Sequence, residues 1–138
     1  MTIDHIGIVV KSIEKGIKHW EEIFGYKQMT EIVTNTRQMV KVVFMSKENS
    51  LLIKLVEPVN ENSPAFRAAV KGGGLHHLCF RCDNIEETID NLSKSGMRVL
   101  AKPQPGEAFS NNNIAFLLGK QGVNIELIDT DEKACLIK

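Results

Sequence analysis

The chain has 138 residues, of which 43% are hydrophobic and 25% charged, and its 17 Lys and Arg balance its 17 Asp and Glu. This composition is typical of a globular protein with a real core. Zero net charge and the lack of a long basic run argue against nucleic-acid binding. No apolar run approaches the ~20 residues of a membrane span. The N-terminus lacks the regions of a signal peptide, so we expect a cytoplasmic protein.

The first half of the chain predicts one strand, a helix and three further strands. Ser12 is placed to cap a helix that ends at Gly25, because serine can accept a hydrogen bond from the first turn and glycine adopts the left-handed backbone that closes a helix. The predicted strands are residues 3–10, 28–34, 39–45 and 51–56. A short helix over 65–71 then ends at three consecutive glycines.

The same order of elements returns after these glycines. Residues 75–82 predict a strand, and Asn84 or Asp83 caps a helix that ends near Gly96. The following elements are a strand, a loop, an irregular polar segment and the two strands of a hairpin, at residues 98–101, 102–106, 107–112, 113–118 and 123–128.

Both halves carry matching residues at a fixed spacing. His5 falls on His77, an offset of 77 − 5 = 72, and the same offset places Ile53-Lys54-Leu55 on Ile125-Glu126-Leu127. This register indicates two copies of one β-α-β-β-β module. We expect one α+β domain over 1–138, with the modules related by a pseudo-twofold axis and mixed sheets curved around a central cavity. Its parts are module one, linker, module two and tail, at residues 3–58, 59–74, 75–129 and 130–138.

Four polar side chains interrupt apolar strands at matching positions of the two modules: His5, Lys54, His77 and Glu126. Alternate residues of a strand share one face, so we expect these four to face the common cavity and His76 to face away from it. Each residue alone could be a satisfied core side chain, because buried polar groups need partners. Two imidazoles and one carboxylate, however, are a sound ligand set for a divalent metal. The repeat therefore favours a metal-competent site.

These segments resemble the vicinal oxygen chelate superfamily, which includes glyoxalase I, bleomycin resistance proteins and ring-cleaving dioxygenases. The similarity lies in Asp4-His5-Ile6-Gly7, Gly73-Gly74-Leu75-His76-His77-Leu78 and Asn124-Ile125-Glu126-Leu127. Leu55-Val56-Glu57-Pro58 is similar to glyoxalase I and methylmalonyl-CoA epimerase-like bacterial proteins. The resemblance implies the glyoxalase-like fold, a homodimer, and a substrate whose vicinal oxygens bind a metal. It makes His5, His77 and Glu126 the metal ligands, with Zn, Ni, Co, Mn or Fe as the ion.

Lys54 departs from the pattern of that superfamily. The epimerases and glyoxalases have Glu or Gln there, and a charged ammonium has no lone pair for a metal. Arg37-Gln38-Met39 likewise offers no carboxylate where the epimerases carry an acidic base. The expected cofactor is therefore a divalent metal ion, or none because Lys54 replaces a usual ligand.

Three functions fit these residues. The first is a metal-dependent isomerase or lyase of the glyoxalase or methylmalonyl-CoA epimerase type that stabilises an enolate, with Glu126 as the base and Lys54 as the second candidate. The second is a metal-free protein that binds a small molecule, as the antibiotic-resistance members do. The third is an Fe(II) ring-cleaving dioxygenase that uses His5, His77 and Glu126.

Candidate substrate contacts lie in and beside the irregular segment 107–112, which we expect to border the mouth of the pocket. They are Phe109, Asn111 and Asn113. A coenzyme A thioester, a glutathione hemithioacetal, another 2-oxo compound or an antibiotic would each suit the cavity. The sequence therefore leaves the substrate open.

Overall fold

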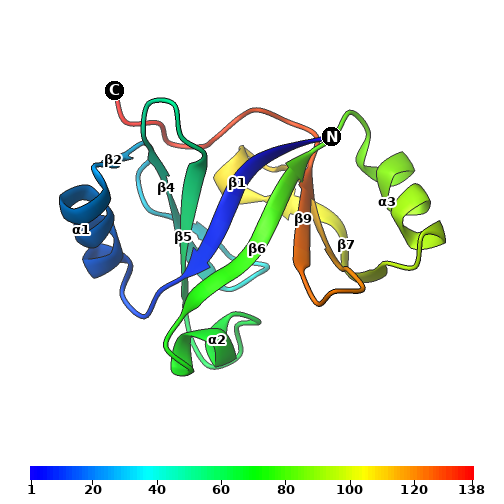
Figure 1. The fold of residues 1–138 in the computed structure, drawn as a ribbon, viewed down its shortest axis with the longest axis horizontal. Helices are drawn as coiled ribbons and strands as arrows, with labels where there is room; N and C mark the ends of the chain where they lie inside the picture. The colour runs from blue at the N-terminus through cyan, green and yellow to red at the C-terminus, as the bar shows by residue number, and fades with distance from the viewer.

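The antiparallel pairing of two strands, β1 (Thr2–Val9) and β6 (Gly74–Arg81), forms the centre of the structure (Figure 1). The computed structural model describes all 138 residues. Ile6 pairs directly with Leu78, its equivalent in the repeat, so a pseudo-twofold axis passes through this pair. The two modules are therefore two halves of one continuous sheet.

The remaining elements follow the same order in both modules. Module one continues with α1 (Ile13–Phe24), β2 (Lys27–Gln28), β3 (Val33–Asn35), β4 (Val40–Ser46) and β5 (Leu52–Pro58), and α2 (Phe66–Val70) lies in the linker. Module two continues with α3 (Ile85–Lys94), β7 (Arg98–Gly106), the 3-10 helix η1 (Glu107–Phe109), β8 (Asn112–Leu118) and β9 (Asn124–Ile128). The nine strands form one mixed sheet, ordered β2-β4-β5-β1-β6-β9-β8-β7 with β3 paired to β4. The predicted α+β class and its repeated modules are confirmed.

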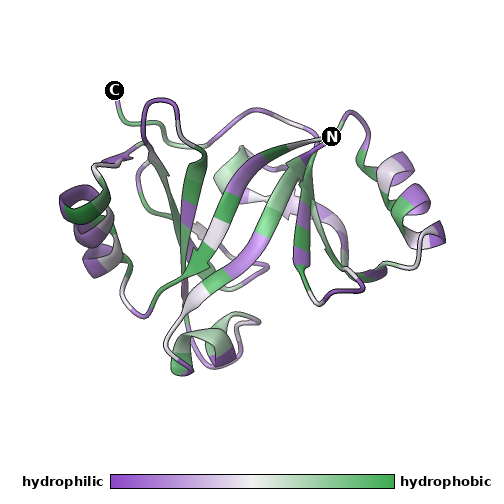
Figure 2. Ribbon diagram, in the orientation of Figure 1, coloured by the Kyte–Doolittle hydropathy of each residue, from purple (hydrophilic) through white to green (hydrophobic).

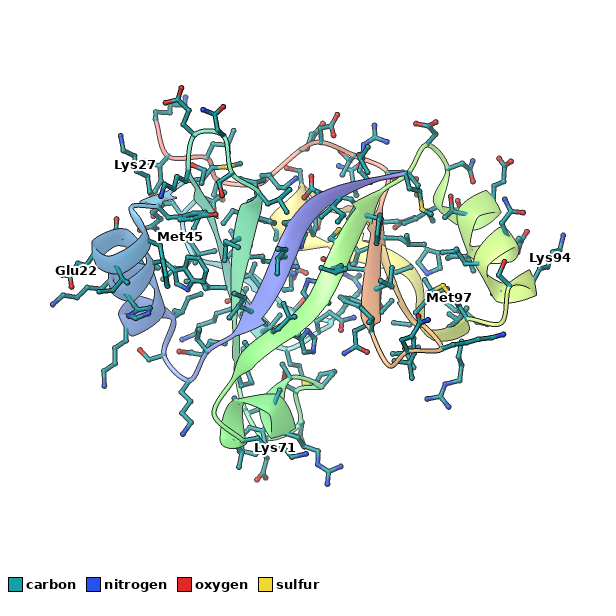
Figure 3. The ribbon with its side chains drawn as sticks, in the orientation of Figure 1. Glu22, Lys27, Met45, Lys71, Lys94 and Met97 are labelled. Atoms are coloured by element: carbon teal, nitrogen blue, oxygen red, sulfur yellow. The ribbon has the colours of Figure 1, made fainter.

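Two long helices cover the two ends of one sheet face. Ser12 Oγ accepts a hydrogen bond from the Lys15 N–H at the start of α1, and Asn84 does the same for Glu87 at the start of α3. Figure 3 shows Met45 on the sheet side of α1 and Met97 on the sheet side of α3, in the apolar layers beneath the helices. No helix is both long enough and apolar enough to span a bilayer.

The largest apolar cluster lies on the other face of the sheet and draws on both modules. Strands β1, β5 and β6 are mostly apolar with polar residues between (Figure 2). Because successive side chains of a strand point to opposite faces, each strand contributes to both faces of the sheet. The cluster includes Val42, Phe44 and Val56 from module one, with Phe109 and Ile114 from module two. The sheet therefore curves, and its two outer parts meet around a shared interior.

A β-bulge interrupts each of the two central strands. The register of β1 against β6 shifts once between Ile3 and His5 and once between Gly7 and Ile8, which leaves Asp4 and His76 as the extra residues. The two bulges lie at equivalent positions of the repeat. Because a bulge breaks the alternation of side chains along a strand, His76 lies beside His77 on the cavity side. The prediction that His76 faces the other way is wrong.

Two predicted elements have different bounds in the structure. The strand expected over 28–34 is divided into β2 and β3, and Thr30 between them bridges to Leu136 in the C-terminal segment. The loop expected over 102–106 is part of β7. β7 lies at the edge of the sheet, where the prolines at 103 and 105 need not donate hydrogen bonds to a neighbour.

Candidate active site and metal centre

Four side chains from the central strands meet on the inner face of the sheet. Lys54 lies beside Gly7 in the β1–β5 pair, and Glu126 lies beside Cys79 in the β6–β9 pair, so the two pairs have the same register. Glu126 Oε1 is 2.9 Å from His5 Nε2 and 3.1 Å from His77 Nε2. Lys54 Nζ donates to Glu126 Oε2 at 3.2 Å. The sequence-predicted residues His5, Lys54, His77 and Glu126 are thus brought together, and all four are buried.

Gly7 makes room for this arrangement. A Cβ at this position would overlap the imidazole ring of His77. His77 therefore reaches the cluster only because its neighbour across the strand pair has no side chain.

The Nδ1 atoms of His5 and His77 contact the two bulge residues, Asp4 and His76. His5 Nδ1 is 2.7 Å from Asp4 Oδ2, and His77 Nδ1 is 2.8 Å from His76 Nδ1. Asp4 in turn accepts a hydrogen bond from Lys133 Nζ at 3.1 Å. Such outer partners fix the orientation of an imidazole and direct its other nitrogen toward a metal. The Nε2 atoms of both histidines accordingly face Glu126.

Burial and the neighbouring charges set the protonation of the cluster. Burial alone would raise the pKa of Glu126, but the Lys54 ammonium and the hydrogen bonds from His5 and His77 outweigh it and hold that pKa well below its usual range. Burial lowers the pKa of His77 to about 4 against the pull of Glu126. Near neutral pH the centre therefore holds an ionised carboxylate and an uncharged His77 imidazole.

The three predicted ligands fit a divalent metal. The ligand atoms of His5, His77 and Glu126 all lie within 4.8 Å of one another. Two imidazole nitrogens and a carboxylate oxygen suit Zn, Ni, Co, Mn or Fe. Lys54 Nζ lies 3.2 Å from Glu126 Oε2, where its charge would compete with a metal ion for the carboxylate.

A cavity of about 280 Å³ opens beside the cluster. Lys54, His76 and His77 form its inner end, and the amides of Asn35, Gln38 and Asn124 add polar groups to its wall. Its apolar lining comes from Val40, Val56, Pro64, Ala65, Leu100, Ala101, Ile114 and Phe116. No carboxylate lines the cavity, and the inner face of β4 carries Val40, Val42 and Phe44 in place of an acid. Residues 37–39 lack the acidic base that the epimerases carry there, and the neighbouring strand β4 does not supply one to the cavity.

The predicted substrate contacts lie outside the cavity wall. Phe109 is fully buried and stacks on His5 with ring centroids 6.2 Å apart, while Lys54 Nζ lies 5.1 Å from the centroid of its ring. Phe109 thus supports the cluster from the side away from the cavity. Asn111 and Asn113 are exposed, and neither lines the cavity.

Sequence reasoning missed several side chains around the site. Asp4 and His76 flank the predicted histidines, but only the bulges turn them inward. No pattern in the sequence pointed to the cavity amides, since Asn35 ends β3, Gln38 lies in the turn after it and Asn124 begins β9. Lys133 lies in the C-terminal segment, where the sequence shows no periodic pattern.

The comparisons with known proteins agree with this geometry. The chain is 32% identical over 102 residues to human mitochondrial methylmalonyl-CoA epimerase, covering 72% of this chain and 57% of the human protein. It is 31% identical over 130 residues to the uncharacterized protein YqjC of Bacillus subtilis, covering 92% of this chain and 91% of YqjC. The chain thus spans just over half the length of the mammalian relative and nearly all of the bacterial one.

A solved structure has the same fold. A variant of the Streptomyces coelicolor methylmalonyl-CoA epimerase, in complex with 2-nitronate-propionyl-CoA, superposes with a TM-score of 0.81 at 25% identity, covering 94% of this chain and 96% of that one. Residues 4–116 match the family described as the glyoxalase/bleomycin resistance protein/dioxygenase superfamily. The match covers most of the chain, including Asp4 and His76 at the bulges and the histidines His5 and His77, and it ends before Glu126. The chain therefore belongs to the glyoxalase/bleomycin resistance protein/dioxygenase superfamily.

Proposed function

We propose that this chain is an isomerase or lyase of the epimerase type that moves a proton at the carbon beside a carbonyl group. The observation that carries the proposal is the meeting of two histidine Nε2 atoms and one buried carboxylate beside a cavity that Lys54 and His77 line. Similarity to methylmalonyl-CoA epimerases over 72% of the chain supports it. Those relatives favour this reaction over ring cleavage by a dioxygenase.

The contacts of Glu126 and Lys54 suggest the role of each residue in the reaction. Glu126 Oε1 faces the two imidazoles, whereas Oε2 has Lys54 as its partner. In this proposal Oε2 is the oxygen that takes a proton from a substrate C–H, and the substrate reaches it past Lys54, because Lys54 lines the cavity and Glu126 lies behind it. The electron pair of that bond moves onto the substrate carbonyl oxygen, and the Lys54 ammonium is placed to hold the resulting negative charge. The proton returns to carbon from Glu126, or from Lys54 as the second candidate.

The apolar walls of the cavity support this role. Charges interact more strongly where water is excluded, and most of the cavity lining is aliphatic or aromatic. A divalent ion held by His5, His77 and Glu126 would add Lewis-acid polarisation of the substrate carbonyl. The outer partners Asp4 and His76 keep both Nε2 atoms available to such an ion.

A thioester with an acidic C–H is the first substrate to test. The Streptomyces coelicolor relative binds an acyl-coenzyme A compound, and small 2-oxo acids are the second class. The resemblance also leads us to propose a homodimer, which light scattering coupled to gel filtration would test.

Proton exchange with solvent tests the proposed reaction directly. Protein purified without chelator is analysed for bound metal and then incubated in D₂O with methylmalonyl-CoA or a 2-oxo acid, while proton NMR follows the α-hydrogen. We expect exchange that chelator abolishes and that Glu126→Gln slows at least about 100-fold. Glu61→Gln, at an exposed position, is the matched control. Exchange that is absent with both substrate classes, in metal-loaded protein, would contradict the proposal.

The Lys54–Glu126 ion pair favours one second candidate, a metal-free protein that binds a small anion. In the cluster every polar side chain has a partner without any metal, because Lys54 and both histidines satisfy Glu126. An anion entering the cavity would compete with Glu126 for Lys54. Calorimetric titration of chelator-treated protein with small carboxylates is the test. Binding that survives chelation, in a protein without exchange activity, would support this candidate.

A further inference from the structure

A buried lysine reaches the site from the C-terminal segment. After β9 this segment crosses from module two to module one. The Ala134 N–H donates to the Ala108 carbonyl of module two at 2.8 Å, and the Glu31 N–H of module one donates to the Cys135 carbonyl at 2.9 Å. Leu136 forms a bridge with Thr30. These contacts fix the segment on both modules and place the side chain of Lys133 inside, with 4% of it exposed.

The surroundings of Lys133 give its ammonium one carboxylate partner. Nζ donates to Asp4 Oδ1 at 3.1 Å and lies 5.3 Å and 5.4 Å from the ring centroids of Phe44 and Phe109. Both rings also contact His5. A buried ammonium between two aromatic rings is stabilised by their faces, but only Asp4 balances its charge.

Lys133 therefore begins a continuous chain of polar contacts through the site. Lys133 Nζ bonds one oxygen of Asp4, and the other oxygen of Asp4 bonds His5 Nδ1 at 2.7 Å. His5 Nε2 then faces Glu126 at 2.9 Å, and Glu126 ends the chain on Lys54. A lysine stands at each end of the chain, and the two carboxylates lie on either side of the His5 ring.

We propose that Lys133 is a positioning residue, which holds Asp4 inward so that Asp4 fixes the His5 ring with Nε2 toward the metal centre. Asp4 is 12% exposed and lies at a bulge, so without Lys133 it can turn toward water. Its bond to His5 Nδ1 would then be lost. The part of this inference that concerns metal affinity rests on the proposed function, whereas the part that concerns the His5 ring does not.

A neutral residue at position 133 should change metal affinity in one direction if Lys133 acts only through its charge, and in the other if it positions His5. Removing a positive charge near a cation site tightens cation binding if charge alone matters. Losing the orientation of a ligand weakens binding, by about 10- to 100-fold for outer partners of metal-bound histidines. The direction of the change therefore identifies the role of Lys133.

Two measurements on Lys133→Met test the inference. Nitrogen-15 NMR of the metal-free protein reports whether Nδ1 of His5 carries a hydrogen-bonded proton, and we expect the Nδ1–H signal of wild type to be lost. Calorimetric titration with Zn²⁺ or Co²⁺ should show affinity weakened about 10- to 100-fold. Lys133→Arg should restore both readouts, and Lys138→Met, at an exposed position of the same segment, should change neither.

The outcomes separate this inference from the proposed function. An unchanged Nδ1–H signal in Lys133→Met, or unchanged or tighter metal binding, overturns the positioning role. Lys133→Gln, which keeps a polar end on a shorter stem, serves as the neutral variant if the methionine variant does not fold. If wild type binds no metal, the proposed function fails, and the NMR comparison still decides whether Lys133 positions His5.

Discussion

Lys54 and Glu126 occupy the same position in the two modules, and their side chains meet at the pseudo-twofold axis with Nζ 3.2 Å from Oε2. Each lies in the last strand of its module, beside the first. A duplicated fold thus brings equivalent positions together, and sequence divergence has given them opposite charges. The pair is also where this chain departs from the Glu or Gln expected of epimerases and glyoxalases. Several predictions about metal binding and stability depend on it and on its neighbours.

Replacement of Lys54 by glutamine should strengthen metal binding. The Lys54 ammonium competes with a divalent cation for Glu126, and like charges this close repel strongly where water is scarce. Glutamine removes the charge and supplies a carbonyl oxygen that can bind the ion. We expect the affinity for Zn²⁺ or Co²⁺ to rise at least about tenfold, or about 1.4 kcal/mol, in calorimetric titrations. Lys102→Gln, at an exposed position, is the control, and equal affinity in both variants would show that Lys54 does not compete with the ion.

Replacement of Gly7 by alanine should displace His77. The new methyl group would overlap the His77 ring, and overpacking of this kind costs about 1–3 kcal/mol. Urea unfolding should show that loss, and metal binding should weaken because His77 leaves the cluster. Gly119→Ala is a matched control, since a Cβ there meets neighbours only at ordinary distances of 3.6 Å and 3.8 Å. Equal losses in the two variants would refute a special role for Gly7.

The contact between Glu107 and Thr36 should make stability depend on pH. Burial opposes ionisation of Glu107, but the hydrogen bonds from the side chain and backbone of Thr36 outweigh it and lower the pKa of the carboxyl group. A lowered pKa stabilises the fold above the ordinary value of 4.5 and ceases to do so as the pH falls through the folded value. Glu107→Gln should therefore cost about 1 kcal/mol at pH 7 and less at pH 3.

Urea unfolding at both pH values measures this difference. Glu132→Gln, at an exposed position, should leave stability unchanged at both. A cost for Glu107→Gln that is the same at pH 3 and pH 7 would mean that packing, and not the charged hydrogen bond, carries the effect.

The Asn35 side chain should stabilise the contact between the two modules. Its buried side-chain oxygen accepts a hydrogen bond from the Ala108 N–H at 2.8 Å. Asn35→Leu would leave that N–H buried and unpaired, at a cost of about 1–3 kcal/mol. The midpoint of urea denaturation should fall accordingly, whereas Asn113→Leu, at an exposed position, should leave it nearly unchanged. Similar midpoints for the two variants would argue that the contact is dispensable.

Much of the fold followed from local pattern and from the repeat. The caps Ser12, Gly25 and Asn84 lie where the sequence indicates, because the residues that end a helix act within one turn of it. The sequence predicts a strand that ends before the prolines of β7, because only the sheet order shows that β7 is an edge strand, where prolines are tolerated. Between β2 and β3, Thr30 bridges to Leu136, more than 100 residues away, and no local pattern contains that contact.

By itself the sequence determined that four polar side chains would meet, because a repeat with an alternating strand pattern leaves His5, Lys54, His77 and Glu126 on one face at equivalent positions. Only the tertiary structure decided what surrounds them. The bulges that turn Asp4 and His76 inward arise from the pairing of β1 with β6, and Lys133 arrives through a segment fixed on both modules. Strand periodicity is a property of each segment alone, whereas a register shift and a docked terminus depend on partners distant in sequence.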